Sequence, residues 1–223
     1  MAEVTISENV NPFIDLEDKP GKPQKYLKNA ELITHYLLIL DRSGSMYSIA
    51  NVTIDGFNKN VDKIKELSEK YPNQKFYVSL VVFNHEIETL LWHKDVNELN
   101  HLSQEKYDPR GNTALYDAVG FSVMKLKSEL EEELKDPNTK VFIAIFTDGA
   151  ENCSKEYTGK VLADMNKKLQ KTEQWTFSYI GANHDVAYAA KSMSIPMSNT
   201  ISYLSTSEGV GSAYKAQISG LDN

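Results

Sequence analysis

Three short segments of the sequence combine carboxylate or hydroxyl side chains with glycine. Asp41, Ser43 and Ser45 alternate in the segment DRSGSM. Thr113 ends the segment GNT, and Asp148 lies in the segment TDG. Carboxylate and hydroxyl oxygens are the hard ligands that Mg²⁺ prefers, and the ion takes about six of them near 2.1 Å. If the fold brings the segments together, these five side chains form an incomplete oxygen shell that leaves room for water or for an oxygen of a partner.

Taken singly, each segment is also typical of an ordinary turn, because serine, aspartate and glycine are frequent turn residues. The set contains neither histidine nor cysteine, which argues against zinc as the ion. The prediction of a metal site therefore depends on where the three segments lie in the fold.

Hydrophobic patterns indicate the elements that must position these side chains. Apolar runs typical of buried strands lie at residues 33–40, 75–83, 141–146 and 175–180. Edge strands are predicted at 87–92 and 201–204. Amphipathic spacing predicts helices at 49–71, 115–130, 160–169, 186–193 and 207–218.

The alternation of strands and helices predicts a doubly wound α/β fold. We expect a mostly parallel central sheet with one antiparallel edge strand, 87–92, and helices on both faces. Sheets of this kind bind ligands outside the carboxyl ends of their central strands. Asp41 and Asp148 follow predicted strands directly, and Thr113 follows a dense turn signal at 108–112. We therefore expect the three segments to meet at one edge of the sheet.

The order and placement of these residues resemble the metal-ion-dependent adhesion site (MIDAS) of von Willebrand factor A (VWA) domains. The resemblance runs from about residue 33 to about residue 205 and rests on the segment DRSGS, on Thr113 and on Asp148 with the glycine that follows it. The segments GNTALYDA at 111–118 and IGAN at 180–183 further resemble stand-alone bacterial and phage members of the family.

The resemblance implies a Rossmann-like VWA fold with Mg²⁺ or Mn²⁺ held on the top face of the sheet. Ser43 and Ser45 would bind the ion directly. Asp41, Thr113 and Asp148 would bind it directly or through water, depending on the liganded state. An Asp or Glu carboxylate of a partner protein would then complete the coordination shell.

Residues beside the predicted ligands are candidates for contact with the partner. These rim candidates are Arg42, Met46, Tyr47, Asn112, Glu151 and Asn152. The alternative for each is a solvated loop residue without a binding role. Many family members have glycine where this chain has Asn112, so the loop that carries Thr113 is expected to be less mobile here.

Other polar residues are interpreted as structural. Asp117 lies near the start of a predicted helix, where a carboxylate complements the helix dipole; the alternative is a hydrogen bond to a metal-bound water. His85, His93 and His184 lack a second histidine at ligand spacing, which favours surface or packing roles. Cys153 has no neighbouring histidine or cation in the sequence that would activate its thiolate.

Composition narrows the class of protein. The chain has 223 residues, which fits one domain at 31–223 preceded by a flexible tail at 1–30. Its net charge of −7 argues against a nucleic-acid partner, and its longest apolar run is far short of the roughly 20 residues that cross a bilayer. A single cysteine excludes an internal disulfide, and we expect a cytoplasmic location.

The leading functional hypothesis is a protein-binding module in which a bound Mg²⁺ captures a carboxylate of a partner. We expect no enzymatic activity, because the phosphate-loop, dinucleotide-binding, nucleophile-elbow and HExxH signatures are all missing from the sequence. Two alternatives stay open at this point. One is a Mg²⁺-dependent phosphohydrolase that uses the same oxygen cluster, and the other is a scaffold in which the metal is purely structural.

Overall fold

The computed structural model describes residues 31–182, 186–204 and 206–222. The expected tail at 1–30 and His184 lie outside these residues. One six-stranded sheet, in the order β3-β2-β1-β4-β5-β6, forms the centre of the domain. The strands are β1 (Leu32–Asp41), β2 (Gln74–Phe83), β3 (Ile87–Asp95), β4 (Thr139–Thr147), β5 (Trp175–Ala182) and β6 (Thr200–Tyr203).

All neighbouring strands pair in parallel except β3, which runs antiparallel to β2 at one edge of the sheet. This confirms the predicted mostly parallel sheet with one antiparallel edge strand. The four inner strands are nearly continuous apolar runs because helices cover them on both faces.

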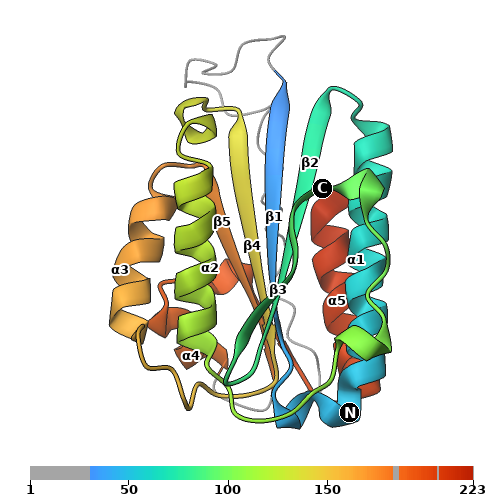
Figure 1. The fold of residues 1–223 in the computed structure, drawn as a ribbon, viewed down its shortest axis with the longest axis vertical. Helices are drawn as coiled ribbons and strands as arrows, with labels where there is room; N and C mark the ends of the chain where they lie inside the picture. The colour runs from blue at the N-terminus through green and yellow to red at the C-terminus, as the bar shows by residue number, and fades with distance from the viewer. Residues whose placement is uncertain (1–30, 183–185, 205, 223) are drawn as a thin grey trace.

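The described residues form five α-helices, and Figure 1 shows them in two layers that flank the sheet. The helices are α1 (Ala50–Lys70), α2 (Leu115–Glu129), α3 (Gly159–Gln170), α4 (Val186–Ser192) and α5 (Ser207–Asp222). α1 and α5 cover one face, and α2, α3 and α4 cover the other. Short 3-10 helices occur in the connections, including η1 (Gly44–Ile49) after β1 and η4 (Glu133–Lys135) after α2.

The side chains of β1 alternate between the two cores. Leu38 and Leu40 pack in the cluster beneath α1 and α5, whereas Leu37 and Ile39 pack in the cluster beneath α2 and α3. All four are buried, so β1 is fixed from both sides. The free energy gained by burying each such side chain is about 1.5–3 kcal/mol, which makes β1 a rigid support for the residues at its ends.

α1 and α5 approach one another closely because α1 carries a glycine at the contact. A Cβ atom on Gly56 would lie only 1.9 Å from the ring of Tyr214, so no larger residue fits without displacing that ring. The Tyr214 ring in turn stacks on Phe146 of β4 at 4.5 Å between ring centroids. This contact seats the last helix on the sheet.

The loops that carry the predicted ligands lie at the carboxyl ends of β1 and β4, at the lower end of the sheet in Figure 1. β1 lies between β2 and β4, where the winding of the chain changes direction, and this is where doubly wound sheets bind ligands. Within the described part of the chain, no helix is both long and apolar enough to cross a membrane.

Candidate metal centre

Asp41 ends β1 with its carboxylate fully buried. The backbone N–H of Ser43 donates to Oδ1 of Asp41 at 2.6 Å, and the hydroxyl of Thr147 donates to Oδ2 at 2.5 Å. The hydroxyl of Tyr107, itself buried, donates to the carbonyl oxygen of Asp41. These contacts fix the orientation of the carboxylate at the end of the strand.

The predicted ligand oxygens converge beside Gly149. The hydroxyl oxygens of Ser43 and Ser45 lie 3.2 Å apart, and the Ser45 hydroxyl donates to Oδ1 of Asp148 at 2.5 Å. A Cβ atom on Gly149 would lie 3.2 Å from Oγ1 of Thr113, 3.5 Å from Oγ of Ser45 and 3.8 Å from Oδ2 of Asp41. The structure thus brings all five side chains together beside Gly149.

The chemistry of this cluster fits a hard divalent cation. Adjacent ligands of an octahedral ion with bonds near 2.1 Å are about 3 Å apart, and the two serine hydroxyls lie 3.2 Å apart. Burial raises the pKa of Asp41 to about 6, against the effect of its hydrogen bonds, and the charge of Asp148 raises it further. A bound cation would oppose both causes, because it stabilises the ionised carboxylates.

Backbone contacts join the loop after β1 to the loop before α2. The N–H of Gly44 donates to the carbonyl of Gly111 at 3.0 Å, and the N–H of Arg110 donates to the carbonyl of Arg42 at 2.8 Å. Gly111 has a φ of +75°, and a Cβ there would lie 2.3 Å from Nδ1 of His85. Glycine is therefore required at this junction, and the junction sets where the Thr113 segment lies.

Two of the rim candidates, Glu151 and Asn152, also connect the loops. Asn152 accepts a hydrogen bond from the N–H of Thr113 at 2.9 Å through Oδ1, and its own N–H donates to the carbonyl of Thr113 at 3.0 Å. The carboxylate of Glu151 accepts from the N–H of Tyr116 in the first turn of α2 at 2.9 Å and from the hydroxyl of Ser154 at 2.6 Å. Both residues therefore position the loop that carries Thr113.

The expectation that Met46 and Arg42 face a partner is wrong for this conformation. Met46 is fully buried and packs in the core beneath α1, because the 3-10 turn η1 directs it inward. The side chain of Arg42 is 10% exposed, and its guanidinium pairs with Glu88 of β3 at 2.7 Å. Tyr47, at 75% exposure, and Asn112 do face solvent beside the oxygen cluster.

Asp117 has a role beyond the one expected at a helix start. Its carboxylate accepts hydrogen bonds from three backbone N–H groups of the loop between β4 and α3, those of Lys155, Glu156 and Tyr157, at 2.8–3.0 Å. It therefore anchors a neighbouring loop, while its place in the first turn of α2 also complements the dipole of its own helix.

Sequence patterns did not single out Thr147 and Tyr107 as supports for the site. Thr147 belongs to the TDG segment, so its place directly before Asp148 was an available signal. Tyr107 is far from Asp41 in the sequence, and nothing in the pattern joins the two. Burial, followed by the charges of Glu151 and Asp117, raises the pKa of Cys153, which agrees with an unreactive thiol.

The chain was compared with known proteins. No family model matches it, and a search of curated proteins found no match. Solved structures do match: the von Willebrand factor domain of a type V pili tip protein from Porphyromonas gingivalis aligns with a TM-score of 0.58 at 11% identity, over 86% of this chain and 96% of that one. The VWA domain of SpRpn10 aligns with a TM-score of 0.51 at 14% identity, over 82% and 93%.

Proximal thread matrix protein 1 from the mussel byssus aligns with a TM-score of 0.57 at 12% identity, over 87% of this chain and 47% of that one. This chain thus spans about half the length of the mussel protein. A further structure of the mussel protein has zinc in its MIDAS motif. Since the identities are low, these matches concern the fold: the chain folds as a von Willebrand factor A domain.

Proposed function

We propose that the chain is a metal-dependent protein-binding module. Five side chains hold Mg²⁺ or Mn²⁺, and a carboxylate from an Asp or Glu of a partner protein completes the coordination shell. The five are Asp41, Ser43, Ser45, Thr113 and Asp148. The observation that carries the proposal is the convergence of their oxygens from three separate loops around the Cβ position of Gly149. Two carboxylates and three hydroxyls are hard donors, which favour Mg²⁺ over zinc.

Different residues of the chain bind the ion and position its ligands. Ser43 and Ser45 present hydroxyl oxygens to the ion, and Thr147 holds the carboxylate of Asp41 in place by its hydrogen bond to Oδ2. Asn152 holds the backbone of Thr113 from both sides. When bound, the ion supplies a Lewis-acidic position that takes an oxygen of a carboxylate.

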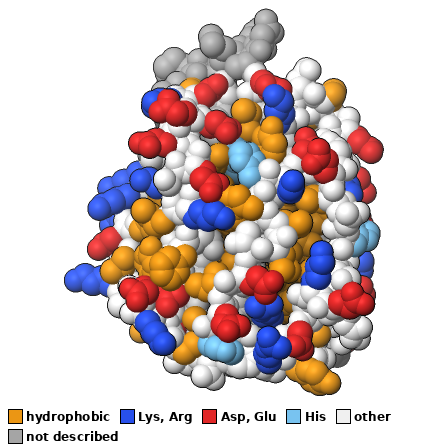
Figure 2. Space-filling view, in the orientation of Figure 1, with side chains coloured by type: hydrophobic (Ala, Val, Ile, Leu, Met, Phe, Trp, Pro, Cys, Tyr) orange, Lys and Arg blue, Asp and Glu red, His pale blue; other side chains and the backbone are white. Residues whose placement is uncertain are grey.

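The surface beside the cluster supports recognition of a protein. Tyr47 is 75% exposed and Asn112 is exposed, so both are available to touch a partner seated at the ion. On the face drawn in Figure 2, acidic and basic side chains are interspersed, and no broad basic patch of the kind that binds nucleic acid is seen there. The exposed Tyr47 and Asn112 therefore support a protein partner.

The proposal includes no catalytic step. If the chain were instead a phosphohydrolase, it would hydrolyse a generic phosphate ester in the presence of Mg²⁺, and the Asp41→Asn variant would lose that activity. The scaffold alternative would lose its fold in chelator and show no binding that depends on a carboxylate. The cytoplasmic location stays a prediction.

The first experiment tests the site with Mn²⁺ as the probe. The relaxation rate of water protons reports both the bound Mn²⁺ and the water on it. We expect binding to be lost in Ser43→Ala and kept in Ser48→Ala, which removes an exposed hydroxyl from the same loop. Adding a peptide that presents one glutamate should lower the relaxation rate, because its carboxylate displaces metal-bound water. Unchanged Mn²⁺ binding in Ser43→Ala would contradict the proposal.

The second experiment tests the partner. Once a partner is identified, its affinity for the chain should fall by at least about 100-fold in chelator, return with Mg²⁺, and fall equally in Ser43→Ala, because a bridging ion contributes several kcal/mol. A partner that binds with full affinity in chelator would rule out the metal bridge.

A further inference from the structure

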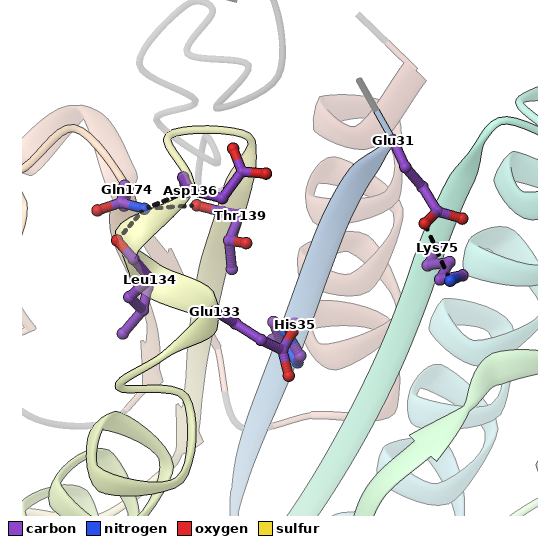
Figure 3. Close-up of polar contacts among 8 residues, drawn as sticks. All are labelled: Glu31, His35, Lys75, Glu133, Leu134, Asp136, Thr139 and Gln174. Atoms are coloured by element: carbon purple, nitrogen blue, oxygen red, sulfur yellow. Dashed lines mark hydrogen bonds and ion pairs between the residues drawn. The ribbon is translucent and has the colours of Figure 1, made fainter. Parts of the chain in front are cut away.

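A second cluster of metal-binding side chains lies at the opposite end of the sheet from the oxygen cluster. His35 comes from the amino-terminal half of β1, His93 from β3, and Glu133 from η4. One potential ligand atom from each lies within 4.8 Å of the others. Nε2 of His35 and Oε2 of Glu133 are 3.1 Å apart, and Figure 3 shows these two side chains pointing toward one another.

The three side chains are supported by their surroundings. The ring of His35 stacks on Tyr77 with 5.3 Å between centroids, and His93 meets both rings edge-on, at 4.9 Å and 4.5 Å. His93 itself lies where the β2–β3 pairing is irregular: its φ is +49°, and its N–H donates to the hydroxyl of Ser79 at 3.0 Å. Such irregularities turn a side chain away from regular alternation, here toward His35.

The turn that carries Glu133 is also held in place. The side-chain amide of Gln174 donates to the carbonyl oxygens of Leu134, Asp136 and Thr139 at 2.9–3.1 Å, as drawn in Figure 3. The backbone after Glu133 is thereby fixed, whereas the side chain of Glu133 is 38% exposed and can adjust. The nearest lysine of β2, Lys75, pairs with Glu31 at 2.9 Å.

We propose that His35, His93 and Glu133 form a second metal site, which binds Zn²⁺ through two imidazole nitrogens and one carboxylate oxygen. Imidazole and carboxylate together suit Zn²⁺ and similar transition metal ions better than Mg²⁺. With bonds of about 2.0–2.1 Å, tetrahedral ligands are about 3.3 Å apart, close to the 3.1 Å between His35 and Glu133. Since the atoms lie within 4.8 Å of one another, His93 must approach by up to about 1.5 Å, and water fills the fourth position.

Burial also affects the ionisation of His35. Burial lowers the pKa of His35 to about 4, although the carboxylate of Glu133 opposes this shift, and the neighbouring His93 lowers the pKa further. The ring is therefore neutral near pH 7, with a nitrogen lone pair to donate. Because Nε2 faces Glu133, it would bind the ion in the tautomer that carries its proton on Nδ1.

A surface pair of the same chemistry provides a matched control. Nε2 of His101 lies 2.7 Å from Oδ1 of Asp62, with both side chains more than half exposed. This pair is not part of any three-residue group with metal-binding geometry in the described chain. A histidine–carboxylate hydrogen bond is thus common to both places, and the third ligand, His93, and the burial of His35 distinguish the first.

The test titrates Zn²⁺ into the full chain by calorimetry. The chain carries Asp148→Ala, so that zinc bound at the oxygen cluster does not contribute and the two sites are tested separately. We expect one Zn²⁺ per chain, with affinity lowered more than about tenfold in His93→Gln and in Glu133→Gln and unchanged in His101→Gln. Co²⁺ in place of Zn²⁺ should give the visible absorption of a tetrahedral site, lost in the same two variants.

His93 and Glu133 are partly exposed, so these variants are expected to fold, which circular dichroism checks. His35→Gln is a further test because it removes a buried ligand and should lower the affinity for Zn²⁺. His35→Cys places another zinc ligand at the same position and should restore that affinity. If His93→Gln and Glu133→Gln bind Zn²⁺ as tightly as the parent, the three residues are only a packed hydrogen-bonded group and the proposal is wrong. Equal weakening by His101→Gln would show adventitious surface binding and would also overturn it.

Discussion

At the scale of single residues, the oxygen cluster depends as much on its supports as on its ligands. Asp41 is fully buried, and its two carboxylate oxygens are engaged by the N–H of Ser43 and the hydroxyl of Thr147. Supports of this kind orient a ligand and tune its basicity, and their loss typically costs about 10–100-fold in metal affinity. Thr147 should therefore matter for metal binding without touching the ion.

Replacing Thr147 with valine tests this role. Thr147→Val keeps the shape of the side chain and removes the hydroxyl that donates to Asp41, so Mg²⁺ affinity should fall about 10–100-fold. Thr147→Ser restores the hydroxyl and should recover most of the affinity. Calorimetric titration with Mg²⁺ measures both variants, and equal affinities for the valine and serine variants would contradict the role.

The buried carboxylate also makes a prediction about pH in the absence of metal. Since burial raises the pKa of Asp41 to about 6, above its unfolded value of 3.8, the folded state binds a proton more tightly than the unfolded state. In chelator, the contribution of Asp41 to stability is therefore present at acid pH and lost as the pH rises from about 4 to about 6, by up to about 3 kcal/mol.

Asp41→Asn should remove this part of the pH dependence. In chelator at pH 7, we expect the variant to be more stable than the parent, because an amide replaces a buried charge, while it no longer binds Mg²⁺. Urea unfolding at several pH values measures the difference. A variant less stable than the parent at pH 7 in chelator would show that the carboxylate is not a destabilising charge.

At the scale of elements, the loops at the carboxyl ends of β1 and β4 behave as one unit. Gly44 and Gly111 join the loop after β1 to the loop before α2. Asn152 and Asp117 join that second loop and α2 to the loop after β4. A change of conformation in any of these loops would therefore be transmitted to the other two.

Asp117 is the residue with which to test this connection. Asp117→Asn replaces one of the two carboxylate oxygens that accept hydrogen bonds from the loop at 155–157. A buried group left without its hydrogen bond costs about 1–3 kcal/mol. We expect a lower free energy of unfolding and faster proteolysis within that loop. Asp164→Asn, an exposed change on α3, is the control and should stay within about 0.5 kcal/mol of the parent. Identical stability of the two variants would contradict the anchor role.

The elements were predictable to different degrees. The strands and helices that build the sheet follow from long periodic apolar patterns, and the mostly parallel order follows from their alternation. The convergence of Asp41, Thr113 and Asp148 could be expected because all three lie at ends of predicted elements. The inward turn of Met46 and the pairing of Arg42 with Glu88 could not, because they depend on the 3-10 turn and on a strand distant in sequence.

The cluster at the other end of the sheet was equally hidden in the sequence. His35 lies in the middle of an apolar run, a pattern that indicates a packed strand residue. Its neighbours His93 and Glu133 come from an irregular edge strand and a short turn. Contacts between such distant positions depend on strand register, which local patterns do not specify.

At the scale of the whole molecule, we expect the fold not to require the metal. Two apolar cores, one on each face of the sheet, are built from residues far from the oxygen cluster as well as near it. A domain of this size buries enough apolar surface to fold without a structural metal. The binding free energy of the ion should therefore add to an already stable fold.

Removal of the metal should lower the melting temperature without unfolding the domain. At a Mg²⁺ concentration of about 100 times its dissociation constant, binding stabilises the fold by about 2.7 kcal/mol, or roughly 5–10 °C in a domain of this size. Calorimetry in Mg²⁺ and in chelator measures the shift, and circular dichroism in chelator should show the helices and strands retained. Unfolding in chelator at room temperature would favour the structural-metal alternative.

The continuous course of β1 has one more consequence. His35 and Asp41 lie on this single buried strand, six positions apart, so their Cα atoms are separated by about 20 Å. Because repulsion between ions falls with distance, we expect only weak coupling between the loading of the two ends. The fixed separation also allows a distance measurement. Mn²⁺ at one end and Cu²⁺ at the other would form a spin pair, and their dipolar coupling would report whether the strand keeps its length when a partner binds.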